Sequence, residues 1–184
     1  MRHWLLAALM MAPAVTLAAE TPWSAMVVPA LMPLPDQPDR VAAAVARMVD
    51  AIFTYTRWPA PRSTIGLCVA GKANYADQLD TITLDGARAV ERRMLPSGED
   101  ALPESCDALY LGAMDATRAR RLIADARGGP VVTIAETDTG CRAGAMFCLL
   151  FSANSLNFQL NIDAVSRSTV RIDPRVLRLS RGGG

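Results

Sequence analysis

Histidine is almost missing from this chain of 184 residues, and the only one, His3, lies at its very beginning. Lysine is nearly absent as well, because Lys72 is the single example and arginine supplies the remaining positive charge. A domain without histidine lacks the commonest general base, proton shuttle and metal ligand. Serine and threonine nucleophiles would have no histidine base, and Lys72 is the only candidate lysine base. These shortages argue against an enzyme and against a resident metal or other cofactor.

Strong net charge and long apolar runs are also lacking. The formal net charge is +1 at pH 7, which gives no long-range attraction toward nucleic acid or anionic lipid. After the first residues, no apolar stretch approaches the roughly 18 residues that a membrane span requires. The cysteines include no C-x-x-C pair, and this absence argues against a zinc site and against a thioredoxin-like redox enzyme.

The N-terminal segment has the features of an export signal. Residues 1–19 combine a short basic start, an apolar middle and small residues at the expected cleavage point, as secretory signal peptides do. Residues 20–37 contain four prolines, at positions 22, 29, 33 and 35, a density that favours extended, solvated chain. We therefore expect a signal peptide over 1–19, a proline-rich flexible leader over 20–37, one domain over 38–181 and a tail over 182–184. The expected location is the bacterial periplasm.

All four cysteines follow the signal segment, so an oxidising compartment would pair them. Four cysteines allow three connectivities. Cys141 and Cys148 flank a short loop and form the natural local pair, whereas Cys68 and Cys106 lie in or just before two apolar strands that could be neighbours. Chain-entropy estimates give about 4 kcal/mol for the long bridge and about 2.5 kcal/mol for the short one. The short bridge is either an inert staple or a redox switch.

Apolar periodicity predicts alternating helices and strands. Apolar residues at spacings of three and four predict a helix that begins at Pro38 and ends before Pro59. Short apolar runs predict strands, and capping residues predict a helix over 115–127. The expected strands are 64–70, 88–95, 108–111, 130–135, 147–151 and 156–160, and the further helical segments are 74–79, 162–168 and 174–179. This order favours a single α/β domain with a largely parallel central sheet flanked by helices and an antiparallel C-terminal extension.

Five carboxylates are candidates for chemistry by residue type alone: Asp107, Glu136, Asp138, Asp163 and Asp173. No spacing among them demands a pair on one face. Glu136 and Asp138 follow a strand end, where sites often occur, but a solvated turn is the better interpretation because loops are normally polar. The same edge of the sheet, near Gly71, Gly112 and Glu136, would offer a crevice to a small molecule.

Several short segments occur in a recognisable order: FTYTRWP at 53–59, LCVAG at 67–71, CDALYL at 106–111, GAMF at 144–147, FQLN at 158–161 and RIDPRVLRL at 171–179. Together they resemble the YfiR-like family of periplasmic regulators, over roughly residues 41–181. The motif positions are Phe53, Trp58, Pro59, Gly71, Asp107, Gly144 and Asn161. Trp58 is expected to fill the core at the helix end, and Asn161 to cap the helix that follows it. The sequence departs from the family at Ala145, where a second glycine is expected.

The resemblance implies a homodimeric α/β protein, and the composition and charge described above predict no catalytic residues, cofactor or nucleic-acid partner. It implies the disulfides Cys68–Cys106 and Cys141–Cys148, with their redox state tied to activity. It also implies that the protein binds and represses the periplasmic part of an inner-membrane diguanylate cyclase, lowers cyclic di-GMP and so regulates biofilm formation. An outer-membrane lipoprotein of the OmpA/Pal type would oppose it. The alternative is a small-molecule-binding or redox-sensing module that acts on another membrane sensor.

Overall fold

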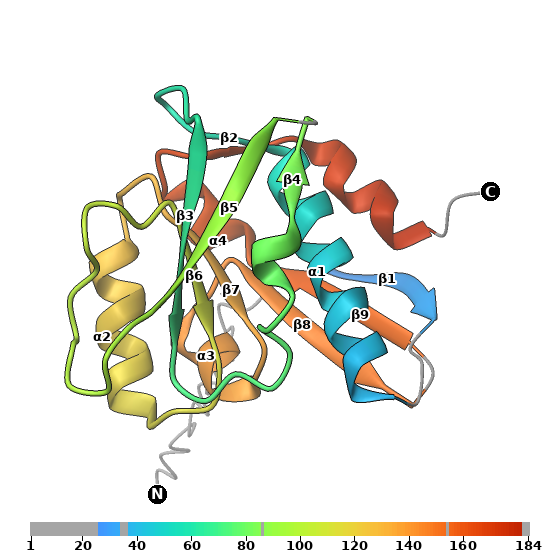
Figure 1. Cartoon of the computed structure of the whole chain (residues 1–184), viewed down its shortest axis with the longest axis horizontal. Coiled ribbons are helices and arrows are strands. Elements are labelled where there is room, and N and C mark those ends of the chain that lie inside the picture. Colours follow the sequence, from blue (N-terminus) through green and yellow to red (C-terminus); the bar gives the residue numbers. More distant parts are fainter. Residues whose placement is uncertain (1–25, 34–36, 86, 154, 182–184) are drawn as a thin grey trace, which may run out of the picture.

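An eight-stranded sheet forms the centre of the computed structural model, which describes residues 26–33, 37–85, 87–153 and 155–181 (Figure 1). Its strands are β1 (Met26–Pro33), β3 (Thr64–Ala70), β4 (Thr83–Leu84), β5 (Arg88–Met94), β6 (Ala108–Leu111), β7 (Val132–Ala135), β8 (Phe147–Ser152) and β9 (Ser155–Leu160). The strand order is β1-β9-β8-β7-β6-β3-β5-β4. Strands β5, β3, β6, β7 and β8 run parallel, whereas β9, β1 and β4 are antiparallel additions. The predicted fold class is confirmed.

The central strands are apolar on both faces because both faces are covered. In β3, Ile65, Leu67 and Val69 point into the larger core cluster. Cys68 and Ala70, which alternate with them, point into a second cluster on the opposite face. This alternation follows from the two-residue period of a strand. It explains why the buried strands read as continuous apolar runs rather than as alternating ones.

Helix α1 (Pro38–Thr54) covers the first face. Proline is favourable at the first helical position, and Val45, Met48 and Ile52 on one side of the helix are buried. Helix α2 (Ala116–Ala126) packs on the second face, and the Asp115 carboxylate caps it by accepting hydrogen bonds from two backbone N–H groups. The remaining helical segments are η1 (Leu79–Thr81), α3 (Asp138–Ala143), α4 (Ile162–Ser166) and η2 (Pro174–Arg181).

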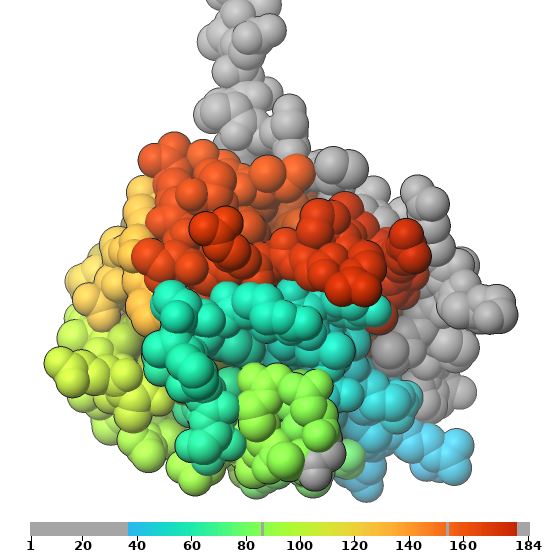
Figure 2. Space-filling model, turned by 90° about the horizontal axis from the view of Figure 1, so that it is seen from above, coloured from blue at the N-terminus to red at the C-terminus, as the bar shows by residue number. Residues whose placement is uncertain are grey.

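The C-terminal segment returns to the end of α1. Strand β10 (Arg171–Ile172) pairs antiparallel with β2 (Thr56–Arg57) in a second, two-stranded sheet. Figure 2 shows this contact from outside, with the C-terminal segment in red lying along the segment after α1 in teal. Val170 and Val176 are buried in the same core cluster as α1. The two ends of the domain therefore share one core.

Three local expectations were wrong. Residues 26–33 of the expected flexible leader form β1, which is hydrogen-bonded along β9 at the edge of the sheet; residues 1–25 and 34–36 lie outside the described residues. Residues 74–79 form turns that lead into η1 rather than a helix. Asp138 begins α3 instead of lying in a turn. Within the described part of the chain, no helix is long and apolar enough to cross a bilayer.

Candidate functional site

Trp58 connects the end of α1 to the start of β6. Its ring meets that of Phe53 edge to face, with centroids 5.8 Å apart and planes at 68°. Its indole Nε1 donates a hydrogen bond to the backbone oxygen of Asp107 at 3.1 Å. Trp58 is half-buried against the core, which agrees with a packing role. The apolar ring of Trp58 thus packs on Phe53 while its only donor, the indole N–H, is hydrogen-bonded to Asp107.

The Asp107 carboxylate fastens β6 to β3. One oxygen accepts a hydrogen bond from the backbone N–H of Gly66 at 3.0 Å, and the other accepts from Arg62 Nε. The Asp107 side chain is only 10% exposed, so this ion pair is well shielded. A Cβ atom on Gly66 would lie 1.9 Å from the backbone oxygen of Ser105, which requires glycine there. The Asp107 carboxylate therefore holds the start of β6 beside β3 and beside the segment that precedes β3.

Both disulfides implied by the family resemblance are present. Cys68 in β3 is bonded to Cys106, which precedes β6, and their Cα atoms are 5.7 Å apart. Cys141 in α3 is bonded to Cys148 in β8, with Cα atoms 5.4 Å apart. Cys68, Cys106 and Cys148 are buried, whereas Cys141 is half-buried. The short bridge is therefore the one that a reductant in solution reaches more easily.

Glu136, at the end of β7, is buried rather than part of a solvated turn, so that interpretation was wrong. It is 5% exposed, and its carboxylate accepts hydrogen bonds from the backbone N–H groups of Asn74 at 2.8 Å and Tyr75 at 3.2 Å. The hydroxyl of Tyr110, from β6, donates a third bond at 2.9 Å. Burial and the nearby Glu136 charge raise the pKa of Tyr110 well above its usual value, so it stays a neutral donor. Glu136 thus anchors the loop after β3 to the sheet.

That loop occupies the crevice expected at the carboxyl ends of β3 and β6. Lys72 and Ala113 form a two-way backbone bridge across it. A Cβ atom on Gly112 would lie 2.4 Å from the backbone N of Ala73. Gly71, with φ of +76°, supplies the left-handed turn that brings the loop back over the strand ends. The edge near Gly71, Gly112 and Glu136 is therefore filled by the chain itself.

The remaining candidate carboxylates form local ion pairs; Asp138 and Asp163 are exposed, and Asp173 is half-buried. Asp138 and Asp163 each pair with an arginine four residues later, and Asp173 pairs with Arg175. Hydrogen bonds from Arg175 lower the pKa of Asp173 to about 2. Among the described residues, no three or more His, Cys, Asp or Glu side chains group in a way that could hold a metal ion. The five candidate carboxylates thus lie apart, each with partners of its own.

A family model described as YfiR/HmsC-like matches residues 42–181. The chain belongs to the YfiR/HmsC-like family. The match begins within α1, ends with η2 and includes both disulfides. Members of this family are regulatory proteins, and membership suggests a periplasmic regulator of cyclic di-GMP signalling.

The motif positions that the YfiR/HmsC-like resemblance singled out lie in three places rather than in one pocket. Phe53, Trp58 and Asp107 form the cluster between α1 and β6, with Pro59 exposed beside it. Gly71 turns the loop above β3. Gly144 ends α3 with φ of +102°, and Asn161 caps α4 by accepting a hydrogen bond from Ala164 N at 3.0 Å. Apart from Pro59, each position has a local structural task.

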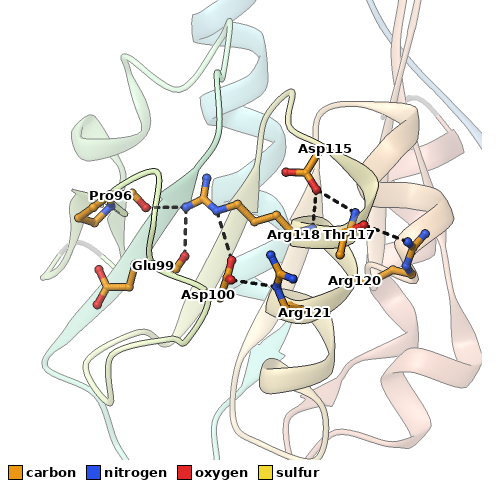
Figure 3. A network of polar contacts seen from close by, with 8 residues as sticks. All are labelled: Pro96, Glu99, Asp100, Asp115, Thr117, Arg118, Arg120 and Arg121. Atoms are coloured by element: carbon orange, nitrogen blue, oxygen red, sulfur yellow. Dashed lines mark hydrogen bonds and ion pairs between the residues drawn. The ribbon is translucent and has the colours of Figure 1, made fainter.

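The sequence did not reveal the part played by Arg118, a buried arginine in α2 (Figure 3). Its guanidinium donates to the backbone oxygens of Pro96 at 2.6 Å and Glu99 at 3.2 Å. Asp100 lies 3.8 Å from Arg118 Nε and 2.9 Å from Arg121 Nε. These contacts hold the loop that leads to Cys106 against α2. A single arginine among several in a helix gives no sequence signal for this task.

Proposed function

We propose that this protein binds the periplasmic part of an inner-membrane diguanylate cyclase and holds the cyclase in a less active state. The observation that carries the proposal is the YfiR/HmsC-like match over residues 42–181. The export signal predicted over residues 1–19 supports delivery to the compartment where the cyclase exposes its periplasmic part. The consequence is a lower level of cyclic di-GMP in the cytoplasm and less biofilm.

The contacts of the acidic side chains support binding rather than catalysis. The carboxylate oxygens of Glu136 and Asp107 already accept hydrogen bonds from backbone N–H groups, a tyrosine and an arginine. A general base needs a free lone pair within reach of a substrate proton. A rigid domain with two disulfides suits a protein that must present a fixed surface to a partner.

Repression requires that the protein bind one state of the cyclase more tightly than the other. A tenfold preference corresponds to about 1.4 kcal/mol of differential binding free energy. An outer-membrane lipoprotein of the OmpA/Pal type would relieve repression by competing for the same protein. Homodimerisation would match the symmetry of a dimeric cyclase.

The test is the level of cyclic di-GMP in the source bacterium with and without the gene. We expect the level to rise on deletion and to return when the full-length gene is supplied. A matched variant that lacks residues 2–19 stays in the cytoplasm and should not restore the low level. In a strain that also lacks its membrane diguanylate cyclases with periplasmic domains, deletion should have no effect. An unchanged level on deletion, or full rescue by the cytoplasmic variant, would contradict the proposal.

A further inference from the structure

An open cleft of about 480 Å³ lies between α2, α3 and α4, on the side of the molecule that carries the short disulfide. Its floor is apolar, formed by Ile123, Ala126, Ala143 and Met146. Its rim carries three arginines, Arg127, Arg142 and Arg167, and one acid, Asp163. The cleft is separate from the strand-end crevice that the chain fills with its own loop. Its volume lies within the roughly 300–1,000 Å³ typical of small-molecule sites.

The rim has an excess of positive charge. Arg142 pairs with Asp138 at 2.7 Å, and Arg167 pairs with Asp163 at 2.9 Å. For Arg127, the described residues supply no hydrogen bond and no ion pair. Arg127 itself lines the cleft, and its charge adds to the hydrogen bond and charge of Arg167 in lowering the pKa of Asp163. One guanidinium is therefore left to bind an anion.

Two motif positions also line the cleft. Asn161 uses its side-chain oxygen to cap α4, and the described residues supply no hydrogen-bond acceptor for its amide NH₂ group. Gly144 has φ of +102°, and the atom nearest to a Cβ built there is Ile123 Cγ2 at 3.9 Å. Gly144 itself therefore adds no side chain to the cleft. An arginine, an amide donor and an apolar floor thus converge on one opening.

We propose that this cleft binds a small organic anion, a carboxylate or phosphate group carried on a short apolar body. The anionic group would take the fork of Arg127 and the amide of Asn161, because charge-assisted bonds to guanidinium are among the stronger ones in proteins. The apolar body would cover Ile123 and Met146. This binding site goes beyond the proposed regulation of a cyclase, and its presence does not depend on that function.

The test measures binding to the purified, disulfide-intact protein by calorimetry and by the shift in Tm. The probes are hexanoate, its uncharged analogue hexanamide, acetate, hexyl phosphate and inorganic phosphate. An eight-atom ligand of good fit should bind with a dissociation constant on the order of 1 mM. We expect hexanoate or hexyl phosphate to bind at least about tenfold more tightly than hexanamide, acetate and inorganic phosphate, because both the charge and the apolar body contribute. Whichever of the two binds more tightly identifies the headgroup.

Two variants locate the site. Arg127→Met keeps an unbranched apolar stem but removes the guanidinium, and it should weaken binding about tenfold or more through the lost charge. Ala143→Leu should fill the floor and abolish binding without lowering Tm. The matched control is Arg47→Met, an exposed arginine on α1 far from the cleft, which should bind as the unaltered protein does. Equal binding of hexanoate and hexanamide, unchanged affinity in Arg127→Met, or no binding of either apolar anion at about ten times the expected constant would overturn the proposal.

Discussion

Replacing Glu136 by alanine should destabilise the protein more than any other single carboxylate change. The substitution removes the acceptor of three hydrogen bonds, which the N–H groups of Asn74 and Tyr75 and the Tyr110 hydroxyl donate to Glu136. The two N–H groups lie on a loop that water can reach. Tyr110, in contrast, is 0% exposed, and its hydroxyl would lose the one hydrogen-bond partner that the described residues supply. An unsatisfied buried donor costs about 1–3 kcal/mol, and each lost bond to a charged group adds to it. We expect a loss of about 3 kcal/mol.

Denaturant unfolding with both disulfides intact measures this loss directly. For a domain of this size, about 3 kcal/mol corresponds to a fall in Tm of roughly 6–12 °C. Hydrogen exchange should increase in the loop over residues 72–78, because its anchor is gone. The matched control is Asp138→Ala, two residues further on, where an exposed ion pair is lost and the cost should stay below about 1 kcal/mol.

A double-mutant cycle tests the reasoning itself. Tyr110→Phe alone should cost about 1 kcal/mol, because Glu136 keeps its two backbone partners. In the Glu136→Ala background the same change should cost less or even stabilise, since it removes a donor without a partner. The coupling energy should therefore be about 1–2 kcal/mol. A loss below about 0.5 kcal/mol for Glu136→Ala, or additive effects of the two changes, would refute the idea that this carboxylate anchors the loop.

Further expectations concern the disulfides and acid stability. Replacing Cys68 and Cys106 by serine should cost about 4 kcal/mol, against about 2.5 kcal/mol for Cys141 and Cys148, because the long bridge closes the larger loop; equal losses in denaturant unfolding would contradict this. Mild reductant followed by thiol labelling and mass mapping should free Cys141 and Cys148 first, because Cys141 is half-buried; earlier labelling of the long bridge would be the opposite result. The depressed pKa of Asp173, about 2 against a usual 3.8, contributes stability above pH 4 that is lost as pH falls toward 2. Asp173→Asn should therefore lessen the acid loss of stability in that window, and an unchanged acid limb in pH-dependent unfolding would count against it.

The parts of the fold that could be predicted are those where local sequence and burial agree. The expected strand at Thr64–Ala70 matches β3 in both bounds. A short, continuous apolar run is typical of a central strand that is buried on both faces of a sheet. The helix over 115–127 was predicted with Asp115 or Thr117 as its cap, and it is Asp115 that accepts from two N–H groups there. The Asn161 cap followed the same reasoning. Local hydrogen bonds of this kind are fixed by residues adjacent in sequence.

What could not be predicted depends on contacts between distant segments. From the sequence, Glu136 has the features of an acidic residue in a solvated loop. Its partners, Tyr110 and the loop after β3, lie 26 and 62 residues away and meet it only in the folded chain. The same holds for Arg118, whose partners lie in the loop before Cys106. Strand β1 was hidden by its prolines, which an edge strand tolerates because one side of its backbone needs no ladder bonds. A buried tyrosine in a predicted strand was the one available signal that a polar partner must exist.

The most direct test of the account is the rate at which a membrane diguanylate cyclase from the same bacterium makes cyclic di-GMP in lipid nanodiscs, with and without the purified oxidised protein. Nanodiscs expose the periplasmic part of the cyclase and leave its cytoplasmic domain open to GTP. The account predicts a saturable fall in rate as the protein is added, and no fall with a cyclase whose periplasmic part has been removed. An unchanged rate at saturating protein with every such cyclase would contradict the central claim.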